Sequence, residues 1–367
     1  MLLIGRLKTV VTSQCKEMNM KKIYIILSTL LGAMIALASC QREDVPHNET
    51  PEEIGAPISF STINASFDTK GDDGETSEEG SETGTTTPEI SSFHVWASRT
   101  YGETANSTTD NSIFSGNEVR YDNGIWKYSP VRYWQTGNYR FVAVSQMTDK
   151  ETFYTGSITN SSLNLNFTSP GWNLSSTPAD LIVASATASG ETQRNNNTEV
   201  AFTFDHQLAM VQFTAKNADT RNATISINSV AIMGNKTTAS GMTYFASSTP
   251  TTTWTFSDVR PVQQLPLQFE AGKSAITLAK DTETILTSEF MVFPQDCTLE
   301  IEISYDVAGN GGTASNNSKS ATKDVSWEAG KIYKYNINVT SDHISFVKEP
   351  TVVEWGTTIS ADADITI

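Results

Sequence analysis

The sequence predicts an all-β protein built from antiparallel β-sandwiches. Apolar and polar residues alternate strictly, most clearly from Leu299 to Val307, where five apolar side chains face one way and four polar side chains face the other. Turn signals rich in Gly and Asn recur between such stretches, as at 122–124 and 309–312. No amphipathic helix of convincing length interrupts the pattern. Many short strands joined by such turns are typical of sandwiches.

The same period of two recurs at 211–215 and at 333–339. A length of 367 residues favours two medium domains over one large core. We therefore expect an N-terminal sandwich over 92–217 and a C-terminal sandwich over 218–367.

Composition excludes several functions. The chain has 41 acidic and 25 basic residues, a net charge of −16, whereas nucleic-acid binding requires a dense Lys/Arg face. The three Cys and four His lack the spacing of a disulfide framework or a zinc site. Phosphate-loop, metalloprotease and nucleophile-elbow motifs are absent from the sequence. No metal, cofactor or catalytic residue is predicted, and the chain is not expected to be an enzyme.

An export signal is predicted over residues 1–40. Two lysines, Lys21 and Lys22, precede a short apolar run from Ile23 to Leu37, and the run ends in Leu37-Ala38-Ser39-Cys40. This ending resembles the lipobox of bacterial lipoproteins, in which the cysteine is acylated, so Cys40 is the predicted lipid anchor. Residues 1–19 add nothing to the signal, and we expect them to reflect an upstream start codon and not translated protein.

Removal of residues 1–40 leaves 20 bases and 40 acids, a net charge of −20. Polar residues 41–56 predict a flexible tether. A strand is predicted from Pro57 to Thr69, with a bulge near Thr62 where the alternation changes phase. Residues 71–91 carry seven acids and no base, which predicts a solvated linker. Segment 57–91 is thus a strand and a linker that precede the first sandwich.

Several residues have side chains that could serve in catalysis or binding, but each is expected to be structural. Glu300 and Glu302 are expected on a solvated strand face, and His206, among apolar neighbours, is expected to be structural. Cys297, the one cysteine left besides the anchor, is expected to pack as a small apolar residue. The aromatic residues are expected to pack mostly in the core, although they could instead form a sugar-binding platform; they are Trp96, Trp126, Tyr133, Trp134, Trp327 and Trp355.

Several motifs together resemble the Mfa-like fimbrillins, the family of type V pilus subunits of Bacteroides-like bacteria. They are Phe93-His-Val-Trp-Ala97, Trp126-Lys-Tyr-Ser-Pro-Val-Arg-Tyr-Trp134, Gly137-Asn-Tyr-Arg-Phe141, Ala179-Asp-Leu-Ile-Val-Ala184, Val200-Ala-Phe-Thr-Phe-Asp-His-Gln-Leu-Ala209 and Trp327-Glu-Ala-Gly-Lys-Ile-Tyr-Lys-Tyr335. Their order and spacing cover essentially the whole exported chain, and the loops between about 217 and 297 match least.

The resemblance implies two transthyretin-like β-sandwiches in a pilus subunit exported as a lipoprotein, surface-exposed on the outer membrane. It also implies a trypsin-like protease that cuts after a basic residue and releases the N-terminal strand. Lys70 stands at the position of the cut, where the family usually has Arg. A strand from a neighbouring subunit then fills the opened groove.

The C-terminus has the pattern of such a donor strand. Five apolar residues alternate with polar ones; they are Ile359, Ala361, Ala363, Ile365 and Ile367. An ordinary last strand of the second sandwich has the same pattern. The implied partners are other pilus subunits, the outer membrane, the protease, and a host or bacterial surface receptor. A surface glycan-binding lipoprotein remains the alternative function.

Overall fold

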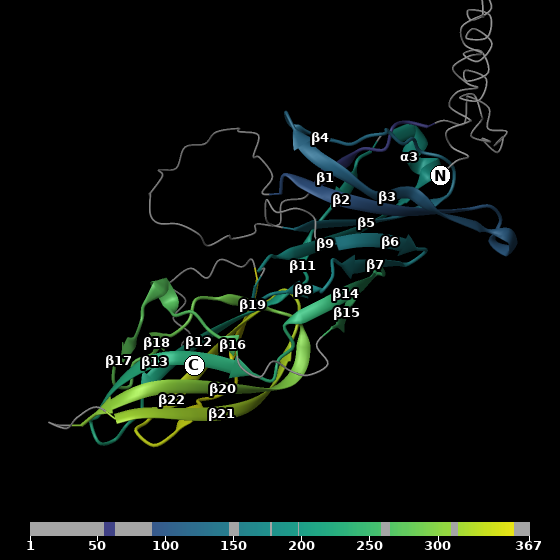
Figure 1. Cartoon of the computed structure of the whole chain (residues 1–367). Coiled ribbons are helices and arrows are strands. Elements are labelled where there is room, and N and C mark those ends of the chain that lie inside the picture. The colour runs from purple at the N-terminus through teal and green to yellow at the C-terminus, as the bar shows by residue number, and fades with distance from the viewer. Residues whose placement is uncertain are drawn as a thin grey trace, which may run out of the picture. The chain divides into compact units, whose positions relative to one another are not determined.

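A computed structural model describes residues 55–62, 90–146, 154–176, 178–196, 198–257, 265–309 and 315–355. All of them belong to the compact unit Ile54–Ile367. The fold is all-β, as predicted, with several antiparallel sheets (Figure 1). The described part of the chain has one short α-helix, α3 (Gly190–Asn196), and two single 3-10 turns, at Thr104–Asn106 and Glu270–Gly272. None of its helices has the length and apolar character needed to cross a membrane.

Two sheets pack face to face in the N-terminal part of the fold. Sheet 1 has the order β11-β9-β5-β2-β3-β4, and sheet 2 has the order β15-β14-β7-β6, with β8 also paired to β14. The strands of sheet 1 are β2 (Ser92–Tyr101), β3 (Thr108–Asp122), β4 (Ile125–Lys127), β5 (Asn138–Gln146), β9 (Leu181–Ser189) and β11 (Asp205–His206). Those of sheet 2 are β6 (Tyr154–Thr159), β7 (Ser162–Phe167), β8 (Trp172–Asn173), β14 (Thr238–Phe245) and β15 (Thr251–Phe256).

Two further sheets form the other sandwich. Sheet 3 has the order β18-β12-β22-β23, and sheet 4 has the order β16-β13-β20-β21. The strands of sheet 3 are β12 (Ala209–Asn217), β18 (Thr284–Ile285), β19 (Phe290–Val292), β22 (Lys331–Val339), β23 (Ile344–Phe346) and β24 (Thr351–Glu354). Those of sheet 4 are β13 (Thr224–Met233), β16 (Leu265–Pro266), β17 (Ile276–Leu278), β20 (Gln295–Ala308) and β21 (Ser315–Trp327).

The alternation read from the sequence matches the burial of these strands. Leu299, Ile301, Ile303 and Tyr305 of β20 are fully buried between sheets 3 and 4, together with the apolar faces of β12 and β22. The pairs within sheets 1, 2 and 4 are all antiparallel. In sheet 3, however, β12 pairs with β22 in parallel. Period-two alternation sets which face is buried, but not which strand lies alongside.

The sheets do not divide at residue 217. Strand β12 ends at Asn217 but lies inside sheet 3, in the second sandwich. Conversely, the β14–β15 hairpin follows that position and joins β7 in sheet 2. The apolar face of β14, with Met242 and Tyr244, completes the core that sheets 1 and 2 share. Strands from both sides of residue 217 therefore contribute to each sandwich.

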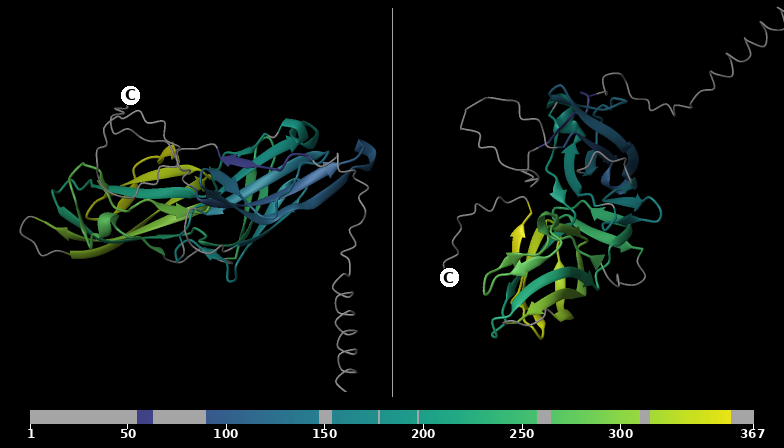
Figure 2. Two further views of the ribbon diagram at one scale, coloured as in Figure 1. Left: turned by 90° about the horizontal axis from the view of Figure 1, so that it is seen from above. Right: turned by 60° about the vertical axis from the view of Figure 1, so that its left-hand side comes forward.

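Sheet 1 is buried on both of its faces. One face, with Trp96 and Val142, packs against sheet 2. The opposite face, with Phe93 and Phe141, packs against a two-stranded parallel pair of β1 (Phe60–Thr62) and β10 (Val200–Phe202). Figure 2 shows sheet 1 from two further directions, with β1 in purple. Burial on both faces explains the continuous apolar runs of its central strands, Phe-Val-Ala-Val in β5 and Leu-Ile-Val-Ala in β9.

A buried carboxylate ties the loop after β12 to the end of β22. Asp219 accepts hydrogen bonds from the hydroxyl of Ser341, from the Ser341 backbone N–H at 2.8 Å and from the Arg221 backbone N–H at 2.7 Å. These hydrogen bonds, with the Ser341 hydroxyl first among them, outweigh burial and lower the pKa of Asp219 to about 2. Because the charged form is favoured in the folded state, its contribution to stability is present above pH 4 and is lost as the pH falls toward 2.

We expect Asp219→Asn to reduce the free energy of unfolding at pH 7 by about 1–2 kcal/mol, since a charged acceptor of buried hydrogen bonds is replaced by a neutral one. The difference from the wild type should shrink between pH 4 and pH 2, where the wild-type carboxylate becomes protonated. Urea unfolding followed by circular dichroism measures both quantities. Asp122→Asn is the control, because the Asp122–Lys127 ion pair is exposed and contributes little. A difference that does not depend on pH would contradict the assignment.

Candidate functional site

The residues that the sequence singled out for anchoring and assembly lie outside the described part of the chain. They are Cys40, Lys70, Ile359, Ala361, Ala363, Ile365 and Ile367. The first half of the predicted N-terminal strand is described, as are the chain segments that surround it. The expected bulge near Thr62 falls at the end of the described stretch, so it stays a prediction.

The N-terminal segment, Gly55–Thr62, lies between two other stretches of chain. On one side Ile58 N donates to Arg132 O at 2.8 Å, and Trp134 N donates to Ala56 O at 2.9 Å. On the other side Val200 N donates to Ser59 O at 2.8 Å, and the parallel pairing of β1 with β10 follows. The segment therefore takes the place of a strand whose backbone is bonded along both edges.

The side chains of the segment fill an apolar site on the outer face of sheet 1, which we call the seat. Ile58 and Phe60 are each only 2% exposed. The Phe60 ring lies within about 6 Å, centroid to centroid, of five aromatic rings; they belong to Phe93, Phe114, Tyr128, Phe141 and Phe202. Full burial of one such side chain contributes roughly 1.5–3 kcal/mol. Two residues of the N-terminal segment thus complete the core on the outer face of sheet 1.

The start of the segment is fitted closely against its neighbours. A Cβ atom on Gly55 would lie 2.6 Å from Trp134 O and 2.6 Å from Arg194 Cγ, closer than side chains approach. Gly55 N donates to Trp134 O at 2.9 Å, so glycine allows the chain to enter the seat at hydrogen-bonding distance. The hydroxyl of Tyr128 donates to Ile58 O at 2.7 Å, and this bond holds the middle of the segment.

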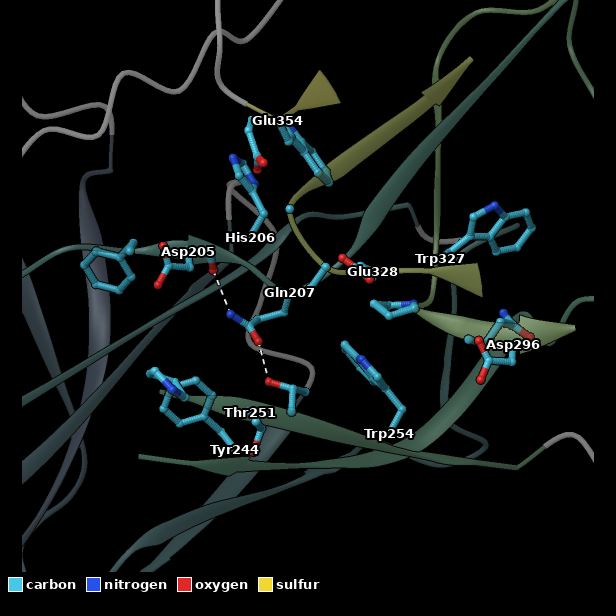
Figure 3. A pocket seen from close by; sticks show the side chains of 18 residues that line it. Asp205, His206, Gln207, Tyr244, Thr251, Trp254, Asp296, Trp327, Glu328 and Glu354 are labelled. Carbon is cyan, nitrogen blue, oxygen red and sulfur yellow. Dashed lines mark hydrogen bonds between the residues drawn. The ribbon is translucent and has the colours of Figure 1, made fainter. Parts of the chain in front are cut away.

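A second feature is a cavity of about 970 Å³ formed by the ends of strands from all four sheets. Figure 3 shows its lining, with His206 and Glu354 on one side and Tyr244, Thr251 and Trp254 on the other. The complete lining is Phe204, Asp205, His206, Gln207, Tyr244, Pro250, Thr251, Thr252, Trp254, Pro294, Gln295, Asp296, Trp327, Glu328, Ala329, Gly330, Glu354 and Trp355.

One wall of the cavity is a stack of two rings. The imidazole of His206 lies 4.0 Å from the indole of Trp355, centroid to centroid, with 6° between the ring planes. His206 Nδ1 is 2.7 Å from Asp180 Oδ2, which sets the orientation of the imidazole. Trp355 N donates to Gly330 O at 2.8 Å. His206 is buried and makes the contacts expected of a structural residue.

The opposite wall combines an amide and hydroxyls with an indole. Gln207 is buried, its amide nitrogen donates to Asp205 O at 2.9 Å, and its amide oxygen accepts from the Thr252 hydroxyl at 2.6 Å. Trp254 packs edge-on against Phe293 at 4.8 Å, so its ring is held in place. The Trp254 indole N–H is buried and has no acceptor among the described residues.

Four carboxylates line the cavity, and none of the lining residues is Lys or Arg. Burial raises the pKa of Asp205, and Glu354 accepts a hydrogen bond from the ammonium of Lys331. Asp296 and Glu328 are exposed. No group of three or more His, Cys, Asp or Glu side chains in the described ranges could hold a metal ion. The arrangement suits hydrogen bonding and ring stacking more than acid–base or metal chemistry.

The six aromatic residues singled out in the sequence differ in burial. Trp96, Trp134 and Trp327 are buried, as expected for core residues, and Trp126 and Trp355 are half-buried. The expectation of core packing was wrong for Tyr133, which is 50% exposed and lies in an exposed stretch, 129–133, that pairs with Pro57.

Other side chains follow the sequence-based expectations. Glu300 and Glu302 lie on the half-buried outer face of β20, where Glu302 accepts from the Ser318 hydroxyl at 2.7 Å. Cys297 is half-buried, and burial, with the nearby carboxylates of Asp296 and Asp324, raises the pKa of its thiol to about 11. Such a thiol is almost wholly protonated near neutral pH and is a poor nucleophile.

Sequence reasoning missed Trp254, Gln207 and Thr252 as lining residues. Trp254 stands in a run of threonines on β15, an edge strand of sheet 2. A large aromatic residue in an otherwise polar edge strand was the available signal. The partner walls come from strands far apart in the sequence, so no spacing rule connects them.

The protein is therefore of the all-β class: its sheets pack face to face in two sandwiches, and the N-terminal segment packs on the outer face of sheet 1. The family model described as "Fimbrillin-like" matches residues 83–355. The chain therefore belongs to the fimbrillin-like family, and the resemblance found in the sequence is confirmed.

One solved structure supports this fold. A fimbrial protein from Bacteroides vulgatus ATCC 8482 matches with a TM-score of 0.53 and 16% identity, covering 82% of this chain and 99% of that chain. Proteins assigned to cell adhesion from Bacteroides uniformis ATCC 8492 and Bacteroides ovatus ATCC 8483 match at 15% identity, with TM-scores of 0.38 and 0.39. Both matches cover 82% of this chain; they cover 98% of the Bacteroides uniformis protein and 97% of the Bacteroides ovatus protein. No curated protein matches the sequence.

Proposed function

We propose that this chain is a structural subunit of a cell-surface pilus that contributes to adhesion. It is exported as a lipoprotein, is acylated at Cys40 and is held at the surface of the outer membrane. Membership of the fimbrillin-like family supports the subunit role, as does the fold shared with a fimbrial protein. A structural role of this kind requires no catalytic residue.

The observation that carries the proposed assembly mechanism is the N-terminal segment in its seat. Its departure would expose the backbone groups of 132–134 and 200–202 and the rings that surround Phe60. An open seat of that kind binds an incoming strand, because the new strand satisfies the backbone groups and fills the apolar positions. In the proposed mechanism a trypsin-like protease cuts after Lys70, and segment 359–367 of a neighbouring subunit replaces the segment.

Limited trypsin treatment of the purified protein tests this mechanism. We expect the wild type to be cut after Lys70 and to form ladders that resist SDS, because each inserted strand is held by a full set of backbone hydrogen bonds. Lys70→Gln should remain monomeric under the same treatment, and Lys70→Arg should behave as the wild type. Mass spectrometry of the new N-terminus and gel electrophoresis give the two readouts.

The matched control is Lys319→Gln, which removes an exposed lysine from β21 and should leave the ladders unchanged. Ladders from Lys70→Gln that equal those of the wild type would exclude Lys70 as the activating cut. A wild-type protein that is cut after Lys70 and stays monomeric would exclude strand exchange.

A further inference from the structure

The cavity around His206 and Trp355 is separate from the site that the N-terminal segment fills. None of its lining residues belongs to the N-terminal segment. Its volume of about 970 Å³ lies at the upper end of the range of small-molecule sites, and its lining combines aromatic rings with a few polar groups. We propose that this cavity binds an uncharged saccharide, so that the subunit carries a glycan-binding site of its own.

The aromatic surfaces are suited to sugar rings. A pyranose presents an apolar face of C–H groups, and an indole presents a flat apolar face of similar size. Trp355 is fixed from one side by the His206 ring and at its backbone by Gly330 O. Trp254 lies on the other side of the cavity (Figure 3), and its ring packs edge-on against Phe293. Because both rings are already in place, little conformational entropy is lost when a ligand binds.

The polar groups are suited to hydroxyls. Asp296 and Glu328 are exposed acceptors at the cavity, and each carboxylate can accept hydrogen bonds from two neighbouring hydroxyl groups. A saccharide offers several hydroxyl donors on the same ring, so it can pair with both carboxylates.

The charge of the lining selects against anionic sugars. The lining has four carboxylates and lacks Lys and Arg, so a sialylated or sulfated glycan would meet like charges. A cationic peptide is the other ligand that such a charge attracts. Glu354 is already paired with Lys331, however, so one of the four carboxylates is not available to a cation. The remaining carboxylates serve a neutral ligand as hydrogen-bond acceptors.

The test is calorimetric and fluorescence titration of the purified protein with defined probes. The neutral probes are hexasaccharides of glucose (α1,4 and β1,4), mannose and N-acetylglucosamine. Sialyllactose and a heparin hexasaccharide are the anionic probes, and hexalysine is the cationic one. We expect at least one neutral hexasaccharide to bind and to change tryptophan fluorescence, with no binding of either anionic probe.

Two variants locate the site. Glu328→Gln changes an exposed side chain, and Trp355→Ala removes the stacking surface; each should weaken binding about tenfold or more, equivalent to roughly 1.4 kcal/mol. Trp126→Ala removes a half-buried tryptophan that does not line the cavity, and Glu300→Gln removes an outer-face carboxylate of β20; neither should alter binding. Circular dichroism confirms that each variant is folded, and Glu328→Gln decides the matter where Trp355→Ala is destabilised.

The proposal is overturned if no neutral hexasaccharide binds, or if binding is unaffected by Glu328→Gln and Trp355→Ala together. Binding of hexalysine alone would instead identify a site for basic peptides. Loss of ladder formation by Lys70→Gln with saccharide binding intact would support both proposals at once, because the two readouts are independent.

Discussion

Phe60→Ala is expected to lower the free energy of unfolding by about 3–5 kcal/mol, the range for removal of a buried aromatic ring. Phe60 is 2% exposed and lies against five aromatic rings, so the surrounding side chains cannot all move into the vacated volume. Urea unfolding of the uncut protein measures the change. It also shows how strongly the N-terminal segment is held before any cut.

Phe245→Ala is the matched control, because Phe245 is 42% exposed at the end of β14 and should change stability by less than about 0.5 kcal/mol. A loss of less than 1 kcal/mol for Phe60→Ala would mean that the segment contributes little to the core. The N-terminal segment would then be bound only weakly in the intact subunit, and it could leave without cleavage.

Ile365→Asp is expected to abolish trypsin-induced ladders while leaving the monomer folded. In the donor model Ile365 is one of five apolar side chains that enter the seat of the neighbouring subunit. A buried carboxylate without a partner costs several kcal/mol, which is enough to reduce an association constant by orders of magnitude. Gel electrophoresis after trypsin treatment, with and without SDS, gives the readout.

Thr366→Asp places the same charge one residue further along, on the polar face of the same segment, and should leave the ladders intact. Equal loss in both variants would indicate a general effect of charge at the C-terminus and not insertion of one face. Ladders from both variants, at wild-type yield, would mean that 359–367 is not the donated strand.

The sequence predicted the strands better than their partners. The alternation of Leu299 to Val307 identified a buried face correctly, because a period of two follows directly from strand geometry. The place of β12 beside β22, and of β14 beside β7, could not be predicted in the same way. Pairing depends on how whole faces fit together across long stretches of chain, and local alternation contains no information on that fit.

The same difference between local pattern and long-range pairing explains which candidate site could be predicted from the sequence. The N-terminal strand was found from Ile58 and Phe60, whose alternation is local. The cavity was not found, because Trp254 lies on β15 while Gln207 and Trp355 directly follow β11 and β24, and these three strands belong to different sheets. Trp355 was noticed as an aromatic residue, but nothing in the sequence showed that its ring lies on His206.

The parallel pairing of β12 with β22 has a consequence for the time course of folding. On the order of a hundred residues separate the end of β12 from the start of β22, and β7 likewise waits for β14. The core of the first sandwich is incomplete until β14 (Thr238–Phe245) is present, and that of the second is incomplete until β22 (Lys331–Val339) is present. Unpaired strands with apolar faces are prone to aggregate during that interval. The second sandwich therefore stays open to such association for longer than the first.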